Sequence, residues 1–179
     1  MKKFELTTES IFVCGRKLYR IRAVKDFGDV KKGDLGGFVE TEDNLSQTDD
    51  AWVYGEAMVY GEARVCGKAE VCGEAEVCGE AVVYGEAMVY GEARVYGEAM
   101  VYGEARVCGK AEVCGEAEVC GEAVVYGEAM VYGEARVCGE ARVCGEAEVC
   151  GEAEVCGNAR ICESNDYATV TGFGSQLRT

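Results

Sequence analysis

A six-residue unit, A-x-V-[Y/C]-G-[E/K], dominates the chain and is written nineteen times in succession from residue 51 to residue 164. Every copy begins with Ala, and the third position is Val in every copy except the last, which has Ile161. Residues two apart point the same way on an extended chain, and the recurrent Gly tolerates the positive φ of a sharp corner. The unit therefore predicts a three-residue strand and a turn, stacked many times into a solenoid that buries Ala and Val.

The spacing of the small and aliphatic residues resembles the hexapeptide repeat of left-handed parallel β-helices. In that family an aliphatic residue is followed four positions later by a small one, as Val59 is by Ala63. The resemblance implies a three-sided coil of 18 residues. A flattened coil of 12 residues is the alternative, and the outward second-position charges leave both open. Opposite-sign neighbours number four at a spacing of 18 and five at 12, with one like-sign pair at each.

Residues 1–50 lack the repeat and are predicted to cap the open end of the solenoid. Two apolar runs, Ile11 to Cys14 and Leu18 to Val24, flank Gly15-Arg16-Lys17 and predict a β-hairpin. The expected fold is thus all-β: a single-stranded, left-handed, three-sided parallel β-helix with an N-terminal β-hairpin cap. The bulky residues expected to cover the first rung are Phe12, Tyr19, Ile21, Phe27 and Phe38.

The segment that leads into the repeats resembles the start of the YdcK-like bacterial proteins. It reads Lys25-Asp26-Phe27-Gly28-Asp29-Val30-Lys31-Lys32-Gly33, then Gly36-Gly37-Phe38-Val39, then Asn44-Leu45-Ser46-Gln47, then Trp52-Val53-Tyr54. Similar proteins of prophage-like elements continue past their repeats into another small domain. The expected organisation is a cap at 1–50, a repeat solenoid at 51–164, and an irregular last rung and tail at 165–179 that resembles the start of such a domain. No established activity comes with this resemblance.

The acidic charge of the chain lies almost wholly in its second part. The net charge is −15, of which residues 1–50 carry −1 (nine basic, ten acidic) and residues 51–179 carry −14 (nine basic, 23 acidic). A polyanion of this kind is not expected to bind nucleic acid or an anionic membrane. Neither a signal peptide nor an apolar run of membrane-spanning length is visible, so a cytoplasmic location is expected.

Eleven of the twelve cysteines occupy the fourth position of the hexad, which Tyr fills in other copies. This interchange indicates a slot that needs no covalent partner, and reduced thiols are expected. On an 18-residue coil, stacked thiols could hold a soft metal ion. The candidate groups are Cys120, Cys138 and Cys156, and Cys144 with Cys162. Small surface residues are the favoured interpretation, so no metal or cofactor site is assigned.

Residues 51–92 and 93–134 are identical at 41 of 42 positions. Seven hexads are not a multiple of three, so the second copy is turned by one face on an 18-residue coil. A localised active site would rarely survive such a rotation, whereas a repeating surface would. Many hexapeptide-repeat proteins are acyltransferases that use a histidine base, and this chain has no histidine.

The sequence therefore predicts a protein that is not an enzyme, with no catalytic residue to assign. The expected function is a structural or protein-interaction scaffold, with a protein partner or self-association. An acyltransferase-like enzyme and a thiol-rich metal-binding surface are the alternatives. Stacked tyrosines, for instance Tyr84 over Tyr102, could bind sugars, and the Glu columns could bind divalent cations. Ordinary packing and a solvated acidic face are the favoured interpretations of these two features.

Overall fold

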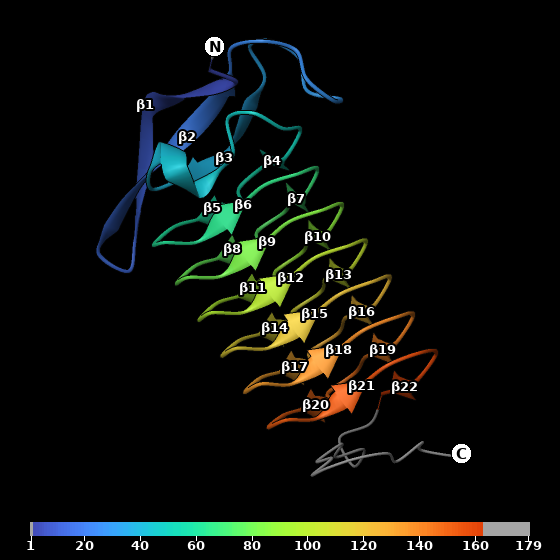
Figure 1. The fold of residues 1–179 in the computed structure, drawn as a ribbon. Helices are drawn as coiled ribbons and strands as arrows, with labels where there is room; N and C mark the ends of the chain where they lie inside the picture. Colours follow the sequence, from blue (N-terminus) through green and yellow to red (C-terminus); the bar gives the residue numbers. More distant parts are fainter. Residues whose placement is uncertain (1, 163–179) are drawn as a thin grey trace.

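The computed structural model describes residues 2–162, and the repeat in them forms a stack of parallel β-coils (Figure 1). Each hexad contributes one two-residue strand, made of its second and third positions, from β4 to β22. Partner strands lie three hexads apart in the chain: Met88 is opposite Arg106, and Val89 is opposite Val107. The 18-residue coil is therefore correct, and the 12-residue alternative is excluded.

The strands form three sheets, one on each side of the coil. The nine-stranded sheet contains, besides three N-terminal strands, β5 (Met58–Val59), β8 (Glu76–Val77), β11 (Arg94–Val95), β14 (Glu112–Val113), β17 (Met130–Val131) and β20 (Glu148–Val149). The seven-stranded sheet contains β4 (Trp52–Val53), β7 (Glu70–Val71), β10 (Met88–Val89), β13 (Arg106–Val107), β16 (Val124–Val125), β19 (Arg142–Val143) and β22 (Arg160–Ile161). The six-stranded sheet contains β6 (Arg64–Val65), β9 (Val82–Val83), β12 (Met100–Val101), β15 (Glu118–Val119), β18 (Arg136–Val137) and β21 (Glu154–Val155). The predicted all-β, three-sided parallel solenoid is confirmed, and its left-handed sense stays a prediction.

The interior of the coil holds the first and third residues of the hexad. Mid-stack residues such as Ala99 and Val101 are 0% exposed, whereas Arg94 and Arg106 at the second position are exposed. The predicted inward and outward positions are therefore correct. Because Ala and Val fill the interior of the repeat, with Ile161 in the last hexad, the core is narrow and its stabilisation is spread along the stack.

Backbone hydrogen bonds join each coil to the next. The N–H of Tyr84 donates to the carbonyl of Val101 over 3.0 Å, and that of Glu86 donates to Gly103 over 2.8 Å. Gly97 shows two separate reasons why the corner needs a glycine. Its φ is +74°, and a Cβ there would lie 2.9 Å from the backbone nitrogen of Gly115 on the next coil.

The N-terminal hairpin consists of β1 (Phe4–Val13) and β2 (Arg16–Ala23), which pair antiparallel around the turn at Cys14 and Gly15. Both turn residues have positive φ, 48° and 78°, as a tight hairpin turn requires. The predicted hairpin is confirmed. A third strand, β3 (Leu35–Val39), pairs antiparallel with β2 and parallel with β5, and so joins the hairpin to the solenoid.

Residues 37–45 form part of a coil although they lack the hexad motif. Val39 lies opposite Val59, and Leu45 forms a bridge to Val65, so both occupy third-position places. The short 3₁₀ helix η1 (Glu42–Asn44) lies between them. The buried Asn44 amide donates to the carbonyls of Gly61 (3.0 Å) and Ala63 (2.9 Å). The non-repeat segment therefore covers the first full coil with a divergent partial coil of its own.

Lys3 and Arg20 fix the hairpin to the first rungs. The buried Lys3 ammonium donates to the carbonyls of Asp49 (3.0 Å) and Ala51 (2.7 Å), and burial lowers its pKa although Asp49 opposes this. The Arg20 guanidinium lies 4.2 Å above the Phe38 ring and bonds to Glu56 over 2.9 Å. These contacts tie β1 and β2 to the start of the stack.

Three of the five expected covering residues pack in or against the hydrophobic clusters, and a fourth is half-buried. Ile21 and Phe38 are buried, Phe27 packs edge-on against Trp52 at 5.3 Å, and Tyr19 is half-buried. The expectation for Phe12 is wrong, because 75% of its surface is exposed. Strand alternation is the reason: Ile11 and Val13 face the cluster around Leu18 and Phe38, so the residue between them faces solvent.

No helical segment within residues 2–162 combines the length and apolar character needed to cross a membrane. The expectations for an irregular last rung and a further domain at 165–179 lie outside the described residues.

Candidate functional site: the tyrosine and cysteine columns

Side chains at the fourth position of the hexad line up in three columns, one at each edge of the coil, because partner strands are three hexads apart. The first column follows the strands from β5 to β20 and contains Tyr60, Cys78, Tyr96, Cys114, Tyr132 and Cys150. The second follows the strands from β4 to β22 and contains Tyr54, Cys72, Tyr90, Cys108, Tyr126, Cys144 and Cys162. The third follows the strands from β6 to β21 and contains Cys66, Tyr84, Tyr102, Cys120, Cys138 and Cys156.

The first column alternates Tyr and Cys throughout, and the second alternates as far as Cys144. A thiol such as Cys114 therefore has a tyrosine on the coil before it and another on the coil after it. Thiols two coils apart are separated by about 9–10 Å, since neighbouring strands are about 4.8 Å apart. Alternation thus keeps most of these sulfurs out of reach of one another.

The third column does not alternate: after Cys66 it has two tyrosines followed by three consecutive cysteines. Cys120, Cys138 and Cys156, the first candidate group from the sequence, are brought to successive coils as expected. Burial, and then the negative charges of Cys120, Cys156 and Glu154, raise the pKa of Cys138 to about 11. Among the described residues, Cys138, Glu154 and Cys156 place one sulfur or carboxylate oxygen each within 4.8 Å of one another.

Glu154 is the residue of this cluster that the sequence analysis missed. It lies two residues before Cys156, on the same outer side of β21, with the inward Val155 between them. An E-x-C spacing on an alternating strand was the available signal. This signal was not used because Glu occupies the second position of several hexads. Only the three consecutive cysteines of the column distinguish Glu154 from the other glutamates at that position.

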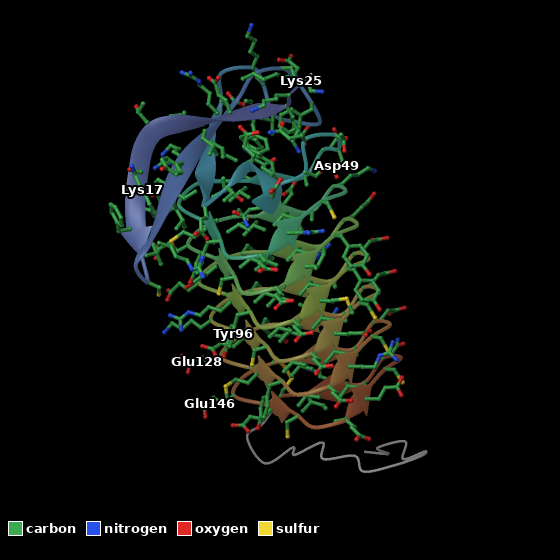
Figure 2. All side chains as sticks on the ribbon, turned by 60° about the vertical axis from the view of Figure 1, so that its left-hand side comes forward. Lys17, Lys25, Asp49, Tyr96, Glu128 and Glu146 are labelled. Atoms are coloured by element: carbon green, nitrogen blue, oxygen red, sulfur yellow. A yellow bond between two sulfur atoms is a disulfide. The ribbon has the colours of Figure 1, made fainter. Side chains whose placement is uncertain are left out.

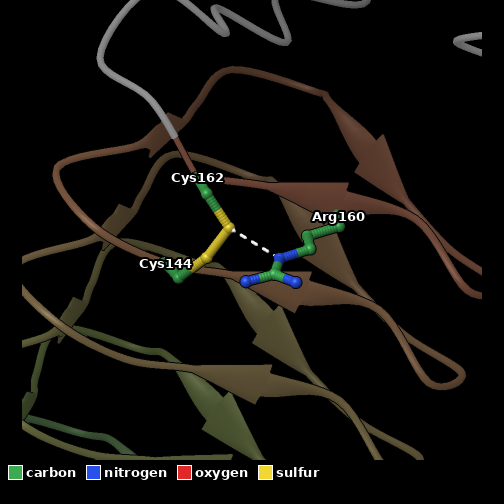
Figure 3. Close-up of a disulfide and its surroundings, with 3 residues drawn as sticks. All are labelled: Cys144, Arg160 and Cys162. Carbon is green, nitrogen blue, oxygen red and sulfur yellow. Dashed lines mark hydrogen bonds between the residues drawn. A yellow bond between two sulfur atoms is a disulfide. The ribbon is translucent and has the colours of Figure 1, made fainter. Parts of the chain in front are cut away.

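Cys144 and Cys162, the second candidate group, are joined by a disulfide in the second column (Figure 3). Their Cα atoms are 4.4 Å apart, at the short end of the usual disulfide range. The expectation of reduced thiols without a covalent partner is wrong for this pair, because the alternation fails here and two cysteines face each other on adjacent coils. The Nε of Arg160 lies 3.1 Å from the Cys162 sulfur (Figure 3).

Tyrosine hydroxyls bond to carboxylates on the adjacent coil. Tyr96 donates to Glu112 over 3.0 Å, Tyr102 to Glu118 over 3.1 Å and Tyr132 to Glu148 over 3.2 Å, and Tyr60 bonds to Glu76. The predicted stacking of Tyr84 on Tyr102 is correct. These contacts support ordinary cross-coil packing for the four bonded tyrosines, because their hydroxyls already have partners within the protein.

Three of the four opposite-sign second-position neighbours of the 18-residue coil form ion pairs along the sheets. Arg94 lies 3.8 Å from Glu76 and 3.4 Å from Glu112, and Arg136 lies 3.1 Å from Glu118. The arginine side chains are 55–59% exposed and their carboxylate partners 21–30%, so solvent screens each pair and its stabilisation is about 1 kcal/mol or less.

Sixth-position residues form three further columns at the corners, and one of them is wholly acidic. Its members are Glu62, Glu80, Glu98, Glu116, Glu134 and Glu152. A shallow groove runs beside four of them, from Glu98 to Glu152. The other two columns contain a cation each, with Lys68 bonded to Glu86 over 2.8 Å and Lys110 within 3.6 Å of Glu128. Figure 2 shows Glu128 and Glu146 of the Lys110 column projecting outward from successive coils.

A comparison with known protein families finds a match within the repeat. Residues 93–109 match the family model described as the YdcK beta solenoid repeat. The repeat of this chain is thus similar to that family, in agreement with the resemblance seen in the sequence and with the β-solenoid fold. A comparison with curated proteins shows no match.

Proposed function

We propose that this protein is a non-catalytic β-solenoid rod that acts as a structural or protein-interaction scaffold. The observation that carries the proposal is the unbroken register of the stack from β4 to β22, in which each strand repeats the geometry of its partner on the coil before. Six steps of about 4.8 Å give a rod of about 29 Å before the cap is added. Surface groups are held at fixed intervals along it, which suits a partner with evenly spaced contacts.

The acidic column, Glu62 to Glu152, is the surface best suited to such a partner. Its six carboxylates are uninterrupted, whereas the other sixth-position columns are broken by Lys68 and Lys110. A partner with basic groups at similar intervals would be drawn to this edge, faster at low salt than at high salt. The same charge disfavours nucleic acid and anionic membranes as partners.

The rotated duplication supports a scaffold over a localised catalytic site. Met58, in the first copy, lies on the nine-stranded sheet, whereas its counterpart Met100 lies on the six-stranded sheet. A constellation built on one face of the first copy is thus moved to another face in the second. An acyltransferase of the histidine-dependent kind needs a histidine base and a loop that leaves the coil. This chain has no histidine, and its strands from β4 to β22 follow one another at a constant spacing of six residues.

Affinity capture from a bacterial lysate, run with two matched variants, tests the proposal. One variant carries Glu98→Gln, Glu116→Gln and Glu134→Gln in the acidic column. The other carries Glu86→Gln, Glu104→Gln and Glu122→Gln and has the same change of charge at another edge. We expect the first variant to lose proteins that the wild type and the second variant retain. Equal retention by both variants would exclude the acidic column as the docking edge, and acyl-CoA turnover above background would exclude a non-catalytic role.

The resemblance to YdcK-like proteins also implies a bacterial or prophage setting. That setting and a cytoplasmic location stay predictions.

A further inference from the structure

Three side chains on two adjacent coils of the third column converge on one point of the surface. β18 and β21 pair in parallel with Arg136 opposite Glu154, which places Cys138 directly over Cys156. Glu154 projects from the same outer face as Cys156, since the two residues flank the inward Val155. Their ligand atoms, two sulfurs and one carboxylate oxygen, lie within 4.8 Å of one another.

Glu154 lacks a salt-bridge partner within residues 2–162. Arg136, the neighbouring cation, turns to Glu118 at 3.1 Å, and no ion pair to Glu154 is formed within those residues. A bound cation would supply a positive charge at this point and stabilise the thiolates that bind it.

We infer that Cys138, Cys156 and Glu154 form a surface site for a thiophilic divalent cation of the Zn²⁺ type. The ligands are the two Sγ atoms and one carboxylate oxygen, with water in the fourth position. Two sulfurs at about 2.3 Å from a tetrahedral ion lie about 3.8 Å apart, which side-chain rotation on adjacent coils can reach. Two thiolates select a borderline-soft ion such as Zn²⁺ over Mg²⁺ or Ca²⁺, which prefer oxygen ligands.

Binding exchanges two protons for the metal ion. Each thiol releases its proton to the solvent as its sulfur bonds to the ion. The charge of the three ligands, −3 when all are deprotonated, is reduced to −1 by a divalent ion. Affinity therefore rises with pH through the neutral range.

The neighbouring columns provide an internal comparison. Cys114 lies between Tyr96 and Tyr132 in the first column, so the neighbouring places of its column hold no second sulfur. Cys144 and Cys162 do face each other, but their disulfide leaves no thiolate to bind a metal. A reducing buffer would open that disulfide and create a competing pair, so the experiment has to remove it.

The test is an anaerobic Co²⁺ titration of the full chain carrying Cys144→Ser and Cys162→Ser, kept reduced by a phosphine. We expect one equivalent of Co²⁺ to produce the thiolate-to-metal charge-transfer absorption of a two-sulfur site, and Zn²⁺ to abolish it by displacement. In the same background, Cys138→Ser and Cys156→Ser should each weaken Co²⁺ binding at least tenfold, and Glu154→Gln several-fold. Cys114→Ser is the matched control and should change nothing.

A second substitution, Cys138→Tyr, protects the test against misfolding, because Tyr fills the same slot in other hexads, as at Tyr84 and Tyr102 of the same column. It should keep the circular dichroism spectrum of the parent and lose the absorption band. The inference is wrong if the parent shows no charge-transfer band. It is also wrong if the band persists in Cys138→Ser and Cys156→Ser, or if Cys114→Ser weakens binding equally.

Discussion

Tyr84 and Tyr102 stack with their ring centroids 4.9 Å apart and their planes inclined by only 6°, although three hexads separate them in the chain. They belong to the same column on adjacent coils, where β9 and β12 pair in register. The Tyr102 hydroxyl also donates to Glu118 on the next coil. One side chain thus contacts both the coil before it and the coil after it.

This stacking predicts an energetic coupling that a double-mutant cycle can measure. For Tyr84→Leu and Tyr102→Leu we expect a coupling of about 0.5–1.5 kcal/mol in urea unfolding, because aromatic pairs gain energy beyond their buried area. The matched cycle pairs Tyr84→Leu with Tyr90→Leu, which lies in a different column. Its coupling should stay below about 0.5 kcal/mol, and an equal value in both cycles would contradict the column arrangement.

The corner glycines predict a difference between two otherwise equivalent substitutions. Gly97 and Gly55 both have positive φ, 74° and 62°, so Ala at either position is strained by about 1 kcal/mol. A Cβ at Gly97 would meet backbone at 2.9 Å, whereas at Gly55 the nearest atom is 3.6 Å away. Gly97→Ala should therefore destabilise by about 1–3 kcal/mol more than Gly55→Ala. Equal melting temperatures would show that the coils have room to separate.

The buried Lys3 predicts that one side chain holds the cap in place. Lys3→Met keeps the side-chain length but leaves the carbonyls of Asp49 and Ala51 without their donor, which should cost about 1–3 kcal/mol. Hydrogen exchange of the amides in β4 and β7 should accelerate. Lys2→Met is the control, because Lys2 is 61% exposed and pairs with Glu42 at the surface. If Lys3→Met and Lys2→Met both leave the stability and the amide exchange nearly unchanged, the cap is held mainly by other contacts and the prediction is wrong.

Cys138 predicts a loss of stability in alkaline solution. Its folded-state pKa of about 11 is above the ordinary value of 9.0, so the folded protein holds this proton more tightly than the unfolded chain does. The resulting stabilisation is complete below pH 9 and is lost as the pH rises through 11. In metal-free reducing buffer, the melting temperature of the wild type should fall more steeply between pH 9 and 11 than that of Cys138→Ser. Parallel curves would show that the thiol is not perturbed by folding.

The hexad alone determines which residues are buried and where the chain turns. Side-chain alternation along an extended strand is a local property, so Ala99 and Val101 could be assigned to the interior and Arg94 to the surface from their spacing. The need for glycine at positive φ is equally local, as is the hairpin around Gly15. The all-β solenoid and its hairpin follow from these rules without knowledge of any long-range contact.

The length of the coil, the partial coil at 37–45 and the meeting of Cys138, Cys156 and Glu154 were decided only by the tertiary structure. Twelve and eighteen are both multiples of six, and the bonds that choose between them join distant hexads, as the N–H of Cys138 does with the carbonyl of Val155. Val39 and Leu45 join the stack through pairing, not through a motif. Glu154 meets Cys138 for the same reason. Which coil lies next to which is set by non-local hydrogen bonds and packing, and a local repeat leaves that choice open.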